Sequence, residues 1–236
     1  MLSPTACSLK WTDLKFSVWE HASSSCRLAT PVKVDSSFDL HNSPQVIRDR
    51  KRMQEAEWPQ VGRGCEGCQR AEALSGNSPR REGNKAHQLA DPTEERFEFL
   101  RASPTHLEIS FNNKCNMKCV YCGPIHSSSW VAEINDNPKA VDPFRFEYDT
   151  AAFVINDQKY QETLENTWGW LRDHADGLNS LTVSGGEPFL QKEVWDLVHW
   201  LADFPNANLH LMIQSNLQIE KAAFELGVQK LLSLAN

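Results

Sequence analysis

His106-Leu-Glu-Ile-Ser-Phe111 leads, after three residues, into Cys115-Asn-Met-Lys-Cys119-Val-Tyr-Cys122, and the expected architecture is built outward from this stretch. The alternation of apolar and polar residues predicts a strand, and the cysteines follow it at C-x3-C-x2-C spacing. Three thiolates can hold three corners of a 4Fe–4S cube and leave the fourth iron open. An open coordination position favours chemistry over a purely structural metal site.

A second stretch, Leu181-Thr-Val-Ser-Gly-Gly-Glu-Pro188, predicts another strand, which ends in Gly185, Gly186, Glu187 and Pro188. Glycine lets backbone approach a ligand closely. An ordinary strand-to-helix turn also favours Gly and Pro. Taken alone, the residues therefore leave both interpretations open.

Strands and helices alternate from residue 106 onward. After the first strand we predict a helix over 159–176, a strand over 180–184, a helix over 190–203, a strand over 208–214, a helix over 219–226 and the start of a strand at Leu231–Leu234. This alternation predicts parallel βαβ units and an α/β fold. Ligands in such folds lie outside the carboxyl ends of the strands. The predicted carboxyl ends carry the cysteine loop, the Gly185–Pro188 motif and the pair Ser215-Asn216.

The remaining four cysteines lie nearer the N-terminus, at Cys7, Cys26, Cys65 and Cys68. Four thiolates can form a closed zinc site or hold a fully ligated iron–sulfur cluster, and a site without metal is the third alternative. The run Gly62-Arg-Gly-Cys65-Glu-Gly-Cys68 would bring backbone amides close to metal-bound sulfurs. Around these cysteines we predict a short strand or hairpin, a helix over 44–57 and a linker over 75–92.

The cysteine loop, with Tyr121 just before its third cysteine, resembles the signature of the radical S-adenosylmethionine (radical SAM) family. The Gly185–Pro188 stretch is similar to the family motif for the methionyl amine of SAM. This resemblance implies a 4Fe–4S cluster on Cys115, Cys119 and Cys122, with the amine and carboxylate of SAM on the fourth iron.

The same resemblance implies further contacts to SAM. The backbone of Gly185 and Gly186 would approach its methionine end, and Glu187 would meet its ammonium; Pro188 belongs to the same cofactor-binding motif. Tyr121 would lie on the cluster or near adenine, with a buried core aromatic as the alternative. Ser215 and Asn216 would touch SAM or substrate, with ordinary turn residues as the alternative.

The implied activity is reductive cleavage of SAM to a 5′-deoxyadenosyl radical, which abstracts hydrogen from a peptide or small-molecule substrate. The implied electron donor is flavodoxin- or ferredoxin-like. No catalytic side chain is assigned beyond the cluster ligands. The rival interpretations are a non-catalytic zinc- or iron-binding interaction module and an inactive fragment of such an enzyme.

The N-terminal cysteines resemble the twitch or SPASM-like auxiliary-cluster modules of some radical SAM enzymes. Two features depart from that pattern: Ser23-Ser-Ser25 precedes Cys26 in place of a glycine, and the module precedes the core. We expect an auxiliary domain and linker over 1–92, and a radical SAM core over 93–236. The core would be a partial (β/α) barrel of about three to four βα units, incomplete at its C-terminal side.

Composition limits the other possibilities. The chain has 236 residues and a formal net charge of −7, which argues against a broad nucleic-acid surface. The basic clusters Arg48–Arg52 and Arg80-Arg81 are interpreted as solvated surface. No signal peptide or membrane-spanning run is evident, so a cytoplasmic protein is expected. Seven cysteines in that compartment favour metal ligands over disulfides.

Overall fold

A computed structural model of the chain describes residues 3–90, 95–137, 153, 155–204, 206 and 208–233. The chain forms two compact units, each drawn from separate stretches of sequence. Unit 1 takes residues 1–16, 20–108 and 170–180, and unit 2 takes residues 17–19, 109–169 and 181–236.

One mixed sheet runs through the described residues. Its six strands are β1 (Asp13–Ser17), β2 (Ala22–Ser24), β3 (Val32–Lys33), β4 (His106–Ser110), β5 (Ser180–Ser184) and β6 (His210–Ile213). The strand order is β3-β2-β1-β4-β5-β6, and the sheet is mostly parallel. Strands β2 and β3 pair antiparallel, with Ala22 opposite Lys33. The α/β class predicted from the sequence is confirmed.

Helices of unit 1 surround a small core. They are α1 (Leu9–Thr12), α2 (Pro44–Gln54), α3 (Glu66–Ser75) and α4 (Pro79–Ala90), with a 3₁₀ turn at Glu95–Glu98. Helix α2 begins as predicted, because Ser43 Oγ accepts from the Val46 N–H at 3.4 Å and Pro44 occupies the first turn. Trp11, Met53 and Phe97 form the core together with Cys7.

The predicted linker over 75–92 is wrong, because most of it forms α4. Ser78 precedes this helix, and its Oγ accepts from the Arg81 N–H at 3.2 Å. Pro79 follows at a position where its missing N–H costs nothing. The Gly/Ser/Pro-rich composition therefore marks only the turn between α3 and α4.

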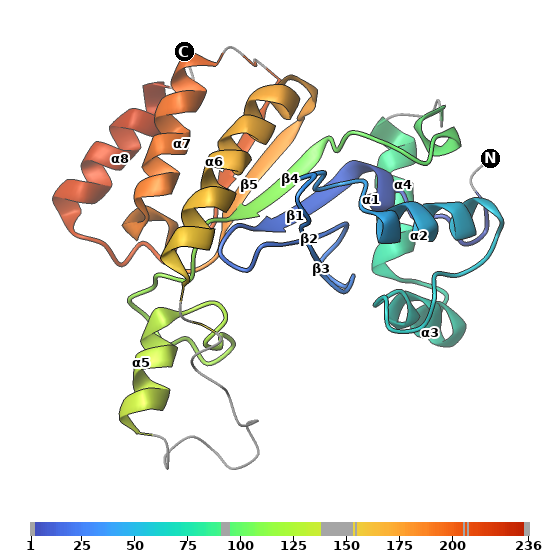
Figure 1. The fold of residues 1–236 in the computed structure, drawn as a ribbon, viewed down its shortest axis with the longest axis horizontal. Coiled ribbons are helices and arrows are strands. Elements are labelled where there is room, and N and C mark those ends of the chain that lie inside the picture. The colour runs from blue at the N-terminus through green and yellow to red at the C-terminus, as the bar shows by residue number, and fades with distance from the viewer. Residues whose placement is uncertain are drawn as a thin grey trace. The chain divides into compact units, whose positions relative to one another are not determined.

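Unit 2 contains the strand ends and the helices beside them. Its helical elements are α5 (Ser128–Asp136), most of α6 (Asp157–His174), a 3₁₀ turn (Pro188–Leu190), α7 (Lys192–Asp203) and α8 (Lys221–Ser233), and a short 3₁₀ turn at Ala175–Gly177 follows α6 in unit 1. Figure 1 shows α6, α7 and α8 side by side. Trp168 of α6 packs on Trp200 of α7, with ring centroids 6.4 Å apart, and Lys230 of α8 lies over the Trp195 ring. The core is apolar and comprises Ile109, Phe111, Leu181, Val183, Val194, Leu197 and Val198.

Two further predictions fall within unit 2. A strand starting at Leu231–Leu234 is wrong, since α8 continues through Ser233. The residues 135–158 have no clear period and contain two prolines, which predicts an insertion; residues 138–152 and 154 of this stretch lie outside the described residues.

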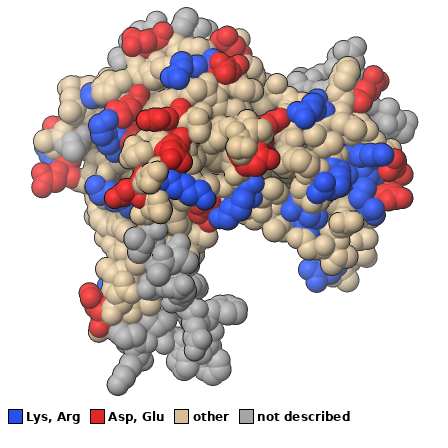
Figure 2. All heavy atoms as spheres, in the orientation of Figure 1, with Lys and Arg blue, Asp and Glu red and all other residues tan. Residues whose placement is uncertain are grey.

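Charged side chains gather over α2 on the face shown in Figure 2. This helix carries Arg48, Lys51 and Arg52, and the last two pair with Glu55 and Glu57. The solvated interpretation of this cluster fails for Arg50, which is fully buried and donates to the Lys10 carbonyl oxygen at 2.8 Å. Among the helices described, none is long and apolar enough to cross a membrane.

Candidate functional site

The three-cysteine loop is fastened by the start of α5. The Cys115 N–H donates to Ser128 Oγ at 3.1 Å, and Ser129 Oγ donates to the Cys115 carbonyl oxygen at 2.8 Å. Trp130 Nε1 donates to the Cys119 carbonyl oxygen at 3.1 Å. These contacts join the loop to a helix start six or more residues further along the chain, and the spacing of the cysteines does not reveal them.

The thiols of this loop lie within electrostatic reach of one another. Burial raises the pKa of Cys122, and the neighbouring Cys119 and Cys115 thiols raise it further. A hydrogen bond with Cys119 raises the pKa of Tyr121, whose side chain is 91% exposed. Tyr121 is therefore not the buried core aromatic that was one of the alternatives.

The Gly185-Gly186 turn lies against the residues that lead into the loop. Both glycines have positive φ, +83° and +53°. A Cβ on Gly185 would lie 1.8 Å from Ser110 Oγ, and one on Gly186 would lie 2.3 Å from the Lys114 carbonyl oxygen. The glycines are thus required by close packing within the protein itself.

Glu187 joins three backbone segments from a fully buried position. Its N–H donates to the Lys114 carbonyl oxygen at 2.7 Å. Its carboxylate accepts from Ser215 Oγ at 2.7 Å, from the Asn216 N–H at 2.7 Å and from the Phe189 N–H at 3.1 Å. Pro188 follows at the first position of the 3₁₀ turn.

The pair Ser215-Asn216 completes this arrangement. Asn216 Nδ2 lies 3.9 Å from Cys115 Sγ and 3.2 Å from Asn116 Oδ1. The three stretches predicted at strand ends are therefore brought together in unit 2. The contact between Asn216 and Cys115 could not be predicted, because it depends on side-chain directions in two separate loops.

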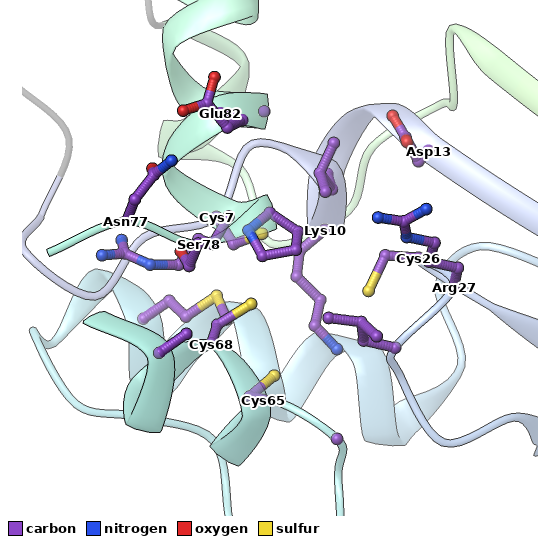
Figure 3. Close-up of a pocket in the computed structure, with 18 of the residues that line it drawn as sticks. Cys7, Lys10, Asp13, Cys26, Arg27, Cys65, Cys68, Asn77, Ser78 and Glu82 are labelled. Carbon is purple, nitrogen blue, oxygen red and sulfur yellow. The ribbon is translucent and has the colours of Figure 1, made fainter. Parts of the chain in front are cut away.

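The other four cysteines line one cavity of about 690 Å³ in unit 1. Cys7 precedes α1, Cys26 follows β2, and Cys65 and Cys68 lie at the start of α3. Figure 3 shows the four sulfurs around this pocket, with the Lys10 side chain running between them.

Gly64 allows two of these cysteine-bearing segments to pack closely against each other. Its φ is +82°, and a Cβ there would lie 1.8 Å from the carbonyl oxygen of Leu28. The adjoining Thr30 N–H donates to the Arg63 carbonyl oxygen at 3.2 Å. The segment after Cys26 therefore lies directly against the turn before Cys65.

Arg80 ties the remaining segments together. Its guanidinium donates to the Ala6 carbonyl oxygen at 2.5 Å and to both Glu72 carboxylate oxygens, at 2.8 and 2.6 Å. Ala6 precedes Cys7, and Glu72 lies one turn after Cys68 on α3. The solvated interpretation of Arg80 is wrong, since only 5% of it is exposed. Ala6 lies 74 residues away in sequence, and the composition around Arg80 does not indicate this contact.

Burial dominates the electrostatics of this cavity. It raises the pKa of Cys7 strongly, with a further increase from the Cys26 thiol, whereas the Lys10 ammonium lowers it. Burial also raises the pKa of Cys65 to about 11, again against the effect of Lys10. The raised pKa keeps the Cys7 and Cys65 thiols protonated at neutral pH, and a metal would have to displace these protons.

Both cysteine sets supply thiols, which are the ligand type of iron–sulfur clusters. One set offers three thiols in a single loop, and the other offers four around one cavity with room for a cluster. In the described part of the chain, no group of three or more His, Cys, Asp and Glu side chains is arranged to hold a metal ion. Comparison of the chain with protein families, curated proteins and solved structures finds no match.

Proposed function

We propose that the chain is a radical SAM enzyme, in which Cys115, Cys119 and Cys122 hold a 4Fe–4S cluster with one open iron. The single observation that carries this proposal is the meeting of three strand ends, marked by the 3.9 Å approach of Asn216 Nδ2 to Cys115 Sγ. When bound, the cluster and SAM would supply one-electron cleavage of the sulfonium and a carbon radical that takes hydrogen from a peptide or small molecule. The electron would come from a flavodoxin- or ferredoxin-like protein.

The protein would hold the cluster ligands through backbone contacts. Ser128, Ser129 and Trp130 fix the carbonyl and amide groups of the loop, and the Met117 N–H donates to Cys115 Sγ at 3.5 Å. Hydrogen bonds of this kind orient ligands and tune a metal site. Tyr121 is exposed beside Cys119 and available to a bound molecule.

Glu187 receives a positioning role in this proposal. Its carboxylate is fully buried and already accepts from three donors, two of them from Ser215 and Asn216. We therefore propose that it fixes the end of β6 against the cysteine loop, in place of the direct ammonium contact implied by the family motif. Gly185 and Gly186 assist by permitting the close packing of the turn.

The parallel strands β4, β5 and β6, with the helices that follow them, would be units of a partial radical SAM barrel. The four cysteines of unit 1 would hold an auxiliary iron–sulfur cluster, and zinc is the competing occupant. Gly64 and Arg80 support this part of the proposal, because they bring the segments of all four cysteines to one cavity.

Anaerobic reconstitution of the full chain with iron and sulfide tests this proposal. We expect about eight irons per chain, since two 4Fe clusters set that number. After one-electron reduction, SAM should change the electron paramagnetic resonance (EPR) spectrum of the three-cysteine cluster, and Cys119→Ala should remove that response. Zinc in both sites, or spectra indifferent to SAM, would support a non-catalytic metal-binding module or an inactive fragment instead.

A further inference from the structure

Lys10 is a buried cation within the four-cysteine cavity. The residue is 1% exposed and lines the cavity with Cys7, Cys26, Cys65 and Cys68. Figure 3 shows its side chain passing between the sulfurs. A buried ammonium is costly unless other groups compensate its charge, so Lys10 requires negative charge close by.

Lys10 shares its direct countercharge with a second cation. Lys10 Nζ lies 2.9 Å from Asp49 Oδ2, and Arg63 Nε lies 3.3 Å from the same oxygen. Two cations thus share one carboxylate, and the Asp49 side chain is only 1% exposed. The nearby Arg80 is paired with Glu72 at 2.6 Å.

Buried donors beside the cysteines also lack acceptors. Within the described residues, Ser8 Oγ, Ser25 Oγ and Arg63 Nη2 are buried without a hydrogen-bond partner. Ser8 directly follows Cys7, and Ser25 directly precedes Cys26. Arg63 lies two residues before Cys65. Buried polar atoms of this kind call for an explanation. An anionic group on the cysteines would supply acceptors to these atoms and a second countercharge beside Lys10.

We propose that Lys10, held by Asp49, is the positioning residue that sets the charge balance and reduction potential of the auxiliary cluster. This inference rests on the proposed iron–sulfur occupant of the four-cysteine site. A cluster on four thiolates carries net negative charge, and reduction adds one more electron. The adjacent ammonium stabilises the reduced form more than the oxidised form, and it thereby raises the potential.

The test uses the full chain carrying Cys115→Ala, Cys119→Ala and Cys122→Ala, so that only the four-cysteine site is observed. After anaerobic reconstitution, iron per chain and the midpoint potential are measured by EPR-monitored redox titration. Lys10→Gln should retain iron and shift the midpoint to more negative values. Asp49→Asn, which keeps the shape and removes the negative charge, should shift it to more positive values. Lys10→Arg should restore the midpoint towards that of the parent.

Lys192→Gln is the matched control, because the Lys192 side chain is 83% exposed and pairs with Asp196 on α7 in unit 2. Its midpoint should equal that of the parent. Iron at the parent level with an unshifted midpoint in both Lys10→Gln and Asp49→Asn would overturn the role of Lys10 alone. If Lys10→Gln does not fold, an unshifted midpoint in Asp49→Asn is sufficient to overturn that role. A parent that binds zinc or no iron would overturn the auxiliary cluster itself, and the role of Lys10 with it.

Discussion

At the scale of single residues, Glu187 shows how a motif residue can act through the protein framework. The family resemblance implies contact with a ligand ammonium, whereas the structure gives its carboxylate three donors within the protein. A buried acceptor of this kind cannot be removed without leaving its donors unsatisfied. The residue is thus important for the arrangement of unit 2 whatever molecule binds there.

Replacement of Glu187 should therefore destabilise the protein. We expect Glu187→Ala to lower the free energy of unfolding by roughly 2–4 kcal/mol, because buried donors lose a charged acceptor. Urea denaturation monitored by tryptophan fluorescence measures the effect. Glu165→Ala, at an exposed position of α6, is the control and should change stability by less than about 0.5 kcal/mol. Equal stability of the two variants would contradict the role given to Glu187.

His41 should make stability depend on pH. Burial lowers its pKa well below the usual value, and the nearby Arg50 and His174 add to this effect. Its Nε2 lies 3.3 Å from the Lys10 carbonyl oxygen, so the neutral ring donates there. The folded state holds His41 neutral, whereas the unfolded chain protonates it below about pH 6.5. Burial of the neutral ring therefore costs no protonation energy above about pH 6.5, and the free energy of unfolding decreases as the pH falls below that value.

The expected loss approaches about 1.4 kcal/mol per pH unit below pH 6.5. Urea denaturation at pH 7.0, 6.0 and 5.0 would measure it in the wild type and in His41→Gln. The variant should show a shallower dependence, because it removes the titrating ring but keeps an amide donor. His210→Gln, at an exposed position, should retain the wild-type slope. Parallel slopes for wild type and His41→Gln would exclude His41 as the source.

At the scale of elements, the turn before α3 determines whether the four cysteines can meet. Gly64 packs on the Leu28 backbone with no room for a Cβ, whereas a Cβ on Gly67 would meet no atom within 4 Å. We expect Gly64→Ala to separate the Cys26 and Cys65 segments and to reduce iron bound at this site by more than half. Gly67→Ala, two residues after Cys65, should leave the iron content unchanged. Iron analysis after reconstitution distinguishes them, and equal retention of iron in both variants would contradict the account.

The sequence predicted the elements of unit 2 better than those of unit 1. Strands β4 to β6 and helices α6 and α7 follow clear periodicity, and each lies within a few residues of its predicted range. Helix α4 was missed because its polar composition resembles a linker, although Ser78 and Pro79 are good start signals. Helix α8 was predicted too short, because the apolar residues after Gly227 resemble a strand. The contact of Arg80 with the Ala6 carbonyl oxygen could not be predicted, since it joins residues more than seventy positions apart.

At the scale of the whole chain, seven cysteines divide into a set of three and a set of four. Spacing alone predicted this division, and the structure gathers the four N-terminal cysteines around one cavity. β1 lies next to β4 in the sheet order, and the sequence did not predict this neighbour. Strand pairing of this kind depends on the tertiary fold, and alternation within one strand does not reveal its neighbour.

The two cysteine sets should act as separate metal sites. Cys65→Ala should lose about four of about eight irons, because only the auxiliary cluster loses a ligand. Cys119→Ala should lose a similar number from the three-cysteine loop. Iron and sulfide analysis of the reconstituted variants checks this partition. Complete loss of iron in either variant would show that the two cysteine sets do not bind iron independently.

We propose that the three-cysteine loop supports reductive cleavage of SAM. Release of 5′-deoxyadenosine is the most direct measure of this reaction. The reconstituted chain is mixed with SAM and dithionite under anaerobic conditions, and products are separated by chromatography. We expect the wild type to release 5′-deoxyadenosine and methionine. Cys119→Ala should release neither product, whereas Cys65→Ala should still release both. A wild-type chain that holds its iron and leaves SAM intact would contradict the claim.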